Sequence, residues 1–84
     1  IDGNFVPKAE ATMSIFDHGY LYGDGVFEGV RVYNGRVFRL EPHIDRLIFS
    51  ARALAFSLEG VTVESVCNAV LETCRRNNHN NGYI

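Results

Sequence analysis

The chain has 84 residues and a formal net charge of −2 at pH 7, with acidic and basic residues mixed along its length. No basic patch is interleaved with aromatic residues, which argues against a nucleic-acid partner. No apolar run reaches the roughly 20 residues that a membrane span requires, so no membrane partner is expected either. The length predicts a single small domain.

The apolar content is high for so short a chain. Hydrophobic residues make up 46% of the sequence and aromatic residues 12%, whereas a domain of this size buries only about 60–65% of the surface of its unfolded chain. We therefore expect a covering partner: the rest of a longer chain, a second subunit, or both. Residues 82–84 resemble the start of a strand, so residues 1–84 are expected to form the N-terminal small domain of a longer protein.

The first quarter of the chain is rich in turn signals. A turn at residues 2–4 is expected to feed a short edge strand, which Pro7 ends. A second short strand is expected within residues 9–15, and residues 17–25 are expected to form a loop. The pattern of a longer strand begins only at Val26.

A β-hairpin is the clearest element of the sequence. One face of the first strand carries three valines and a glutamate, at Val26, Glu28, Val30 and Val32. The other face is mixed, with Phe27, Gly29, Arg31 and Tyr33. Asn34-Gly35 predicts a two-residue turn, after which residues 36–40 return as the second strand. A type I′ turn pairs Val32 with Val37 and Tyr33 with Arg36, which makes the valine face the expected core face.

Two amphipathic helices follow the hairpin. Pro42 suits the first turn of the first helix, whose apolar residues recur at helical spacing: Ile44, Leu47, Ile48, Ala51, Leu54 and Ala55. Gly60 breaks this pattern, and Thr62 is the expected N-cap of the second helix. Its apolar stripe is Val63, Val66, Cys67, Val70, Leu71 and Cys74, and residues 77–82 end it. The expected fold class is α+β, a small antiparallel sheet with two helices packed on one face.

The glycines of residues 23–29 resemble a phosphate-binding loop, but their context does not fit. A dinucleotide fingerprint needs a strand before its glycines and a helix after them, whereas here a loop precedes Gly23 and a strand follows Gly25. Gly29 interrupts that strand, which indicates either a bulge or a place where a ligand approaches the backbone. The residues alone leave both interpretations open.

The segment from Phe16 to Ala51 resembles the N-terminal domain of the class IV, fold type IV, pyridoxal-phosphate-dependent aminotransferases. Three motifs carry the resemblance: YGDGVFEG at 22–29, RVYNG at 31–35, and HIDRL at 43–47 followed by Ser-Ala. Tyr22 and the pattern Phe27-Glu28-Gly29-x-Arg31 are most similar to the branched-chain amino acid aminotransferases. The alternatives are a D-amino acid aminotransferase, which usually has Tyr-Glu in place of Phe-Glu, an aminodeoxychorismate lyase, or a non-enzymatic α+β module that dimerises or binds a ligand.

The resemblance implies five site residues. Arg46 matches the arginine that binds the phosphate of pyridoxal 5'-phosphate, a role suited to the donor fork of a guanidinium. Tyr22, Phe27, Gly29 and Arg31 match residues that line the substrate pocket. In the family the residue that matches Tyr22 reaches the active site of the neighbouring subunit, so Tyr22 is expected to mark the interface of a homodimer or a higher homo-oligomer. The alternatives are a solvated Arg46, an ordinary packed Tyr22, and a second core face from which Arg31 extends into solvent.

The reactive lysine of this chemistry is expected outside residues 1–84. In the family a lysine forms the Schiff base with pyridoxal phosphate and shuttles the proton, whereas Lys8, the one lysine here, matches no catalytic position. We therefore expect a catalytic C-terminal domain beyond this piece, no catalytic residue within it, and no activity of the piece alone. The implied enzyme moves amino groups between branched-chain L-amino acids and 2-oxoglutarate.

Two further expectations concern the cysteines and metals. Cys67 and Cys74 are seven residues apart on one helix, about 10 Å along its axis, which is too far for a disulfide. Free thiols fit a reducing cytoplasm. The histidines and aspartates follow no spacing typical of metal ligands, so no metal site is expected.

Overall fold

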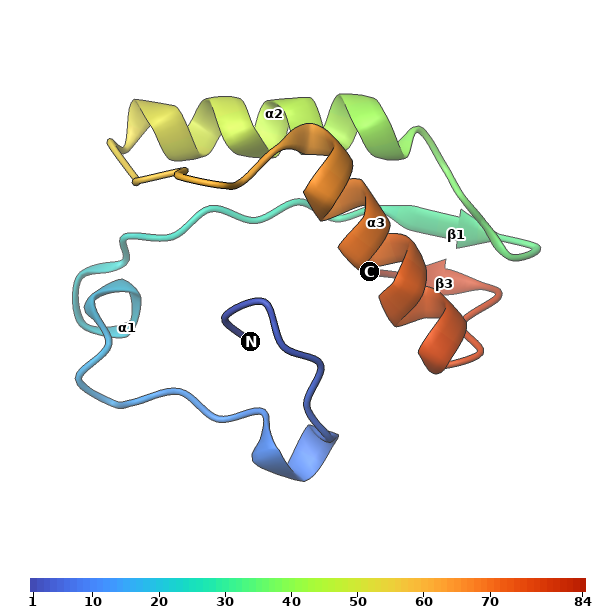
Figure 1. Ribbon diagram of the computed structural model, residues 1–84, viewed down its shortest axis with the longest axis horizontal. Coiled ribbons are helices and arrows are strands. Elements are labelled where there is room, and N and C mark those ends of the chain that lie inside the picture. The colour runs from blue at the N-terminus through green and yellow to red at the C-terminus, as the bar shows by residue number, and fades with distance from the viewer.

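The computed structural model describes residues 1–84. Its elements follow the order η1 (Lys8–Glu10), α1 (His18–Tyr22), β1 (Arg31–Tyr33), β2 (Arg36–Val37), α2 (Leu40–Ala53), α3 (Val63–Arg76) and β3 (Gly82–Tyr83). The strands form one antiparallel sheet of order β2-β1-β3. Figure 1 shows α2 and α3 crossing beside this sheet, while residues 1–24 form an arm that runs apart from the sheet. The expected α+β class is confirmed.

The hairpin has the expected turn and register. Val32 pairs with Val37 and Tyr33 with Arg36, and both turn residues, Asn34 and Gly35, have the positive φ that a type I′ turn requires. The valine face is the buried one, since Val30 and Val32 are only 4% and 0% exposed.

Both hairpin strands are shorter than expected. The first begins at Arg31 rather than at Val26, because residues 26–29 have no neighbouring strand to pair with. The second strand is shortened as well. It ends at Val37 rather than Leu40, because Phe38 and Arg39 form a turn in which Arg39 adopts a φ of 50°. This turn directs the chain into α2, so that Leu40 becomes the first helical residue and is buried in the core.

The last strand of the sheet comes from the C-terminal end of the chain. β3 pairs with β1 so that Arg31 faces Tyr83 and Val32 faces Gly82. Two backbone hydrogen bonds between Val30 and Ile84, at 2.9 and 3.1 Å, extend this pairing beyond β1. The strand expected near residue 82 is therefore present.

The two long helices form the core with the hairpin. Leu40, Ile44 and Ile48 of α2 make up its buried centre. Partly buried apolar residues surround them: Val37, Leu47, Leu58, Val63, Val66, Cys67 and Val70. Pro42 lies in the first turn of α2, as predicted. The helix ends at Ala53, before the predicted Leu54 and Ala55, because Ala55 has a φ of 58°.

The start of α3 is the predicted one. The Thr62 hydroxyl accepts a hydrogen bond from the backbone N–H of Ser65 at 3.0 Å, and the Ser65 hydroxyl accepts one from the backbone N–H of Thr62 at 2.9 Å. This reciprocal capping satisfies two backbone donors that the first turn of a helix leaves free. Cys67 and Cys74 lie along α3 as free thiols.

The turn predicted at residues 2–4 is present, since Asp2 and Gly3 have positive φ and the Asn4 N–H donates to the Ile1 carbonyl oxygen at 2.9 Å. The two strands predicted for the N-terminal arm are absent. Residues 5–6 and 9–15 form no strand, and the short 3-10 helix η1 occupies Lys8–Glu10 instead. Strands need a neighbouring strand to pair with, and the arm runs apart from the sheet (Figure 1). The expected loop at residues 17–25 contains the five-residue helix α1, because the Asp17 carboxylate caps it by accepting from the Gly19 N–H at 2.9 Å.

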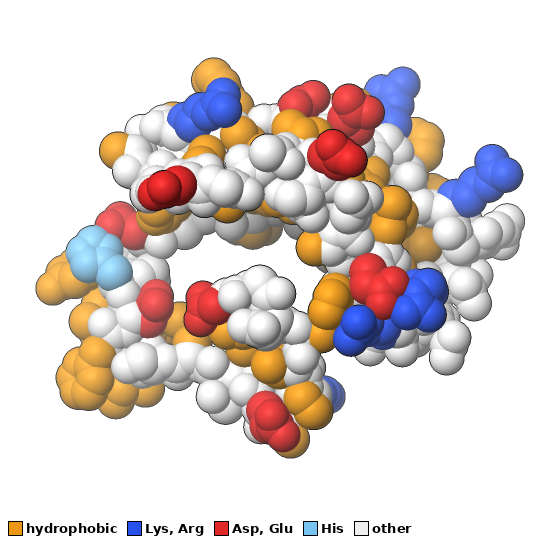
Figure 2. Space-filling view, viewed as in Figure 1, with side chains coloured by type: hydrophobic (Ala, Val, Ile, Leu, Met, Phe, Trp, Pro, Cys, Tyr) orange, Lys and Arg blue, Asp and Glu red, His pale blue; other side chains and the backbone are white.

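The surface keeps much of its apolar character. Six residues are buried: Val30, Val32, Leu40, Ile44, Ile48 and Ala51. Large apolar side chains are exposed along the arm and at both ends of the chain, and Figure 2 shows them around an opening between the arm and the helices. No helix combines the length and apolar character needed to span a bilayer.

Candidate functional site

A carboxylate, a guanidinium and an imidazole meet where the segment before β1 passes α2. Arg46 donates through Nε to Glu28 Oε1 at 2.6 Å and through Nη2 to Glu28 Oε2. His43 Nδ1 lies 2.8 Å from Glu28 Oε2 and 3.2 Å from Arg46 Nη2. We assign the Nδ1 proton to His43 because its shorter contact is with a carboxylate, which only accepts. These three residues are called the Glu28 cluster below.

The cluster follows from two periodicities. Glu28 alternates in phase with Val30 and Val32, which are buried, so its side chain faces α2 rather than the open side. His43 and Arg46 are three residues apart in α2 and therefore neighbours on one side of the helix. The Glu28 side chain is 12% exposed and that of Arg46 is 63% exposed. The carboxylate is thus covered, while the guanidinium remains open to solvent.

Glu28 and Arg46 are both charged over the physiological pH range. Hydrogen bonds from Arg46 and then from His43 lower the pKa of Glu28 from 4.5 to about 2. The same carboxylate raises the pKa of Arg46 above its usual value. Because hydrogen bonds to the charged form of a group favour that form, both partners stay ionised at neutral pH.

Arg46 keeps one edge available for an anion. Its contacts with Glu28 use Nε and Nη2, so Nη1 remains outside the pair. A small cavity of about 130 Å³ is lined by Arg39, Pro42, His43 and Arg46. A guanidinium offers the donors that phosphate and carboxylate oxygens prefer.

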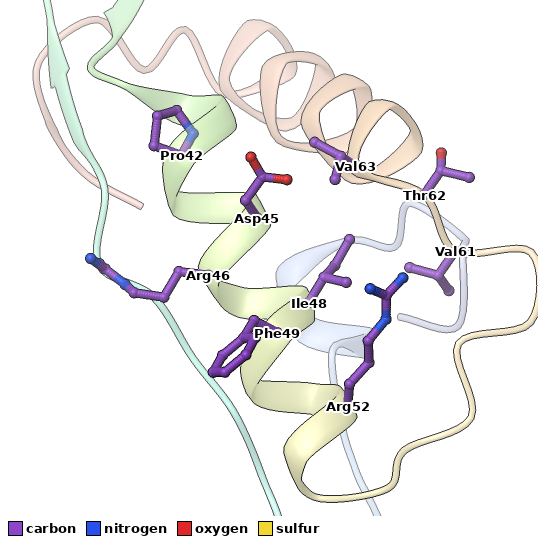
Figure 3. A pocket seen from close by; sticks show the side chains of 9 residues that line it. All are labelled: Pro42, Asp45, Arg46, Ile48, Phe49, Arg52, Val61, Thr62 and Val63. Atoms are coloured by element: carbon purple, nitrogen blue, oxygen red, sulfur yellow. The ribbon is translucent and has the colours of Figure 1, made fainter.

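A wider cavity of about 770 Å³ runs along α2 and the start of α3. Figure 3 shows its lining residues, Pro42, Asp45, Arg46, Ile48, Phe49, Arg52, Val61, Thr62 and Val63. Arg46 reaches toward the segment that leads to β1, whereas Arg52 points to the other side of α2, toward the loop before α3. The two arginines therefore do not form one binding group.

The mixed face of the β1 segment is open at one end and closed at the other. Phe27 is 92% exposed. A Cβ placed on Gly29 would meet no atom within 4 Å, and Gly29 lacks a positive φ, so neither crowding nor backbone conformation within these residues requires a glycine there. The Arg31 guanidinium, in contrast, lies between the rings of Tyr33 and Tyr83, 4.8 and 4.9 Å from their centroids.

Residues 25–84 match the family described as Amino-transferase class IV. The chain belongs to this family. The matched range contains the Glu28 cluster, Phe27, Gly29 and Arg31, and it begins after Tyr22.

Several curated proteins are similar to this chain in sequence. A protein of Methanocaldococcus jannaschii, provisionally named a branched-chain-amino-acid aminotransferase, is 51% identical over all 84 residues. The D-alanine aminotransferase of Staphylococcus haemolyticus is 40% identical over the same 84 residues. Branched-chain-amino-acid aminotransferase-like protein 2 of Arabidopsis thaliana is 44% identical over 73 residues, 87% of this chain and 13% of its own length. The chain spans 29% of the length of the first two relatives.

The class IV aminotransferase chain brings some of its predicted site residues together and separates others. Phe27 and Gly29 flank Glu28 along the chain, and Glu28 binds Arg46, so these four residues are neighbours. Tyr22 ends α1, which lies at the opposite end of the molecule from β1 (Figure 1). Tyr22 is 70% exposed, and its ring is 4.5 Å from that of His18.

Sequence reasoning missed two features of this family member. The first is the role of Glu28, although a carboxylate in phase with three valines was a usable signal, because a charge on a core face needs a partner. The second is the contact of Tyr33 and Tyr83 with Arg31. It corrects the expectation that Arg31 could extend into solvent, and it depends on the pairing of β1 with β3, which spans most of the chain.

Proposed function

We propose that this chain is the N-terminal domain of a pyridoxal-phosphate-dependent enzyme that transfers amino groups between branched-chain L-amino acids and 2-oxoglutarate. The observation that carries the proposal is the 51% identity, over all 84 residues, to the Methanocaldococcus jannaschii protein named for the branched-chain reaction. The Arabidopsis thaliana relative, whose name describes it as like a branched-chain-amino-acid aminotransferase, adds support at 44% identity over 73 residues.

Arg46 is proposed to hold the phosphate of the cofactor. Its Nη1 edge is not used by Glu28, and the small cavity that Arg46 lines is also lined by a second guanidinium, that of Arg39, and by His43. These residues suit a phosphate group. When bound, pyridoxal phosphate supplies a ring that withdraws electrons from the amino-bearing carbon of the substrate. Arg46 contributes by anchoring that ring at its phosphate end.

Four residues are proposed to form part of the substrate pocket. Phe27 presents a bare ring beside the open backbone of Gly29, which suits an aliphatic side chain. Arg31 is held between two tyrosines and offers positive charge near the same face. Tyr22 is proposed to reach the site of a partner subunit, since α1 lies far from β1 within one chain.

The reactive lysine and a catalytic C-terminal domain are proposed to lie outside residues 1–84. Lys8 is an exposed residue of η1, in the arm that runs apart from the sheet. On this proposal the 84 residues supply the phosphate contact and pocket wall but not the group that moves the proton, so they are inactive alone.

A homodimer in the cytoplasm is also proposed. The exposed apolar side chains of the arm, among them Phe16 at 79% and Tyr20 at 67%, support a covering partner. Two free cysteines fit a reducing compartment. Sedimentation of the full-length protein tests the first point, because a monomer at micromolar concentration contradicts it.

The D-alanine aminotransferase reaction is the second candidate, favoured by the 40% identity over 84 residues to the Staphylococcus haemolyticus enzyme. The deciding experiment mixes full-length holoenzyme with a panel of L- and D-amino acids and follows the cofactor absorbance. We expect a spectral change with L-leucine, L-isoleucine, L-valine and L-glutamate. A change with D-alanine alone selects the second candidate. No change with any amino acid, together with release of pyruvate from aminodeoxychorismate, selects the lyase.

A further inference from the structure

We propose that Glu28 is a positioning residue for cofactor binding: it holds the Arg46 guanidinium in one orientation, with the Nη1 edge facing the phosphate. The inference rests on the phosphate-binding role proposed for Arg46. Glu28 itself touches neither substrate nor cofactor on this proposal, and it acts only through Arg46.

The geometry of the pair supports a positioning role. An arginine whose side chain is 63% exposed has many rotamers available, and a ligand that binds it must fix one of them. The contacts of Nε and Nη2 with the two Glu28 oxygens fix both the position and the plane of the guanidinium. Glu28 can do this because its own carboxylate is covered and is also bound by His43 Nδ1 at 2.8 Å.

An opposing effect must be weighed, because Glu28 is negative and so is a phosphate. The carboxylate lies against the Nε–Nη2 edge, so the positive guanidinium stands between it and an anion at Nη1. Repulsion between charges falls with distance and is screened near the solvent. We therefore expect orientation to outweigh repulsion, and removal of the carboxylate to weaken phosphate binding rather than strengthen it.

A purely structural role makes a different prediction. The Glu28 cluster also ties the segment before β1 to α2, so its loss could disturb the pocket as a whole. Such a disturbance weakens every ligand of the pocket, with or without a phosphate. A loss of orientation at Arg46 weakens only ligands that carry the phosphate.

The test compares pyridoxal phosphate with pyridoxal, which lacks the phosphate, as ligands of the full-length apoenzyme. The dissociation constants of both are measured by absorbance for wild type, Glu28→Gln, Arg46→Ala and the double variant. We expect Arg46→Ala to reduce the preference for the phosphate ester roughly ten- to a hundredfold. We expect Glu28→Gln to reduce it by up to about tenfold, the cost of ordering a freely rotating side chain on binding. The double variant should lose no more than Arg46→Ala, because the two residues act as one unit.

Glu72→Gln is the matched control. Glu72 accepts from Arg75 through Nε and Nη2, both at 2.6 Å, so it makes the same kind of pair on α3, away from the cluster. Glu72→Gln should leave the preference for pyridoxal phosphate over pyridoxal unchanged. If Glu28→Gln does not fold, Glu28→Asp replaces it, because the shorter side chain keeps the charge but draws the carboxylate back from Arg46.

Each outcome decides between the two proposals. The Glu28 variant can keep the wild-type preference for pyridoxal phosphate over pyridoxal, or exceed it, while Arg46→Ala reduces that preference. This result overturns the positioning role and leaves the proposed function standing. An unchanged preference in Arg46→Ala contradicts the phosphate role of Arg46 itself. Equal weakening of pyridoxal and pyridoxal phosphate by Glu28→Gln shows a structural role and also overturns the inference.

Discussion

Glu28 carries its charge on the side of the chain that elsewhere bears buried valines. Its partners come from α2, where His43 and Arg46 share one side of the helix. None of the three is informative alone, because a glutamate, a histidine and an arginine on a small domain are usually solvated. They become informative because the extended segment before β1 passes α2, where Glu28 fixes the orientation of the otherwise exposed Arg46 guanidinium.

The pH dependence of stability checks this cluster. The Glu28 pKa is lowered in the folded state from 4.5 to about 2, so the pair stabilises the fold above pH 4.5 and that contribution is lost as the pH falls toward 2. Urea unfolding of the full-length wild type and of Glu28→Gln should therefore give a difference in the free energy of unfolding that is constant near neutral pH. This difference should shrink below pH 4.5. A difference that does not change with pH would mean that Glu28 is not paired in solution.

Phe27 is the residue whose exposure is hardest to explain by folding alone, since it is 92% exposed. If the ring forms the apolar wall of the substrate pocket, Phe27→Ala should reduce leucine turnover more than glutamate turnover. An apolar contact of this kind discriminates by about 1–3 kcal/mol, so the ratio of kcat/KM values should shift roughly tenfold or more. Steady-state kinetics with leucine and with glutamate measure this ratio. Equal losses of kcat/KM for the two donors would mean that Phe27 only supports the fold.

At the scale of elements, two glycines differ in whether the fold of these residues requires them. Gly82 has a φ of 140°, and a Cβ there would lie 2.8 Å from the His79 ring, whereas a Cβ on Gly29 meets nothing within 4 Å. Gly82→Ala should therefore destabilise the β3 pairing by about 1–3 kcal/mol, while Gly29→Ala should leave the melting temperature of the full-length protein near that of wild type. Equal melting temperatures for both variants would contradict the placement of β3.

The elements also show what a sequence can predict. The hairpin register followed from strict alternation around Asn34-Gly35, and the start of α3 followed from the capping chemistry of Thr62. Both signals are local. The strands expected in the arm failed because a strand needs a neighbour, which local pattern does not supply. The Glu28 cluster and the tyrosines around Arg31 likewise depend on segments far apart in the chain.

At the scale of the whole molecule, a small core coexists with a large apolar surface. Three residues of α2 form the buried centre of the helix pair, and the arm contributes no buried residue. The chain spans 29% of the length of the first two relatives, so most of each relative has no counterpart among these 84 residues. On the proposed function, the arm and the mixed face of β1 are completed by the remaining chain and by a partner subunit.

On the proposed function, the reactive lysine lies outside these 84 residues, and Lys8 provides a test of this placement. If the reactive lysine lies elsewhere, borohydride reduction of the full-length holoenzyme should fix the cofactor on a lysine outside residues 1–84, as peptide mapping reports. Lys8→Gln should keep wild-type turnover and cofactor content, because Lys8 lies exposed in η1, in the arm that runs apart from the sheet. The 84 residues alone should show no transamination of L-leucine, since they then lack the group that moves the proton. Cofactor found mainly on Lys8 would contradict both the assigned reaction and the phosphate role of Arg46.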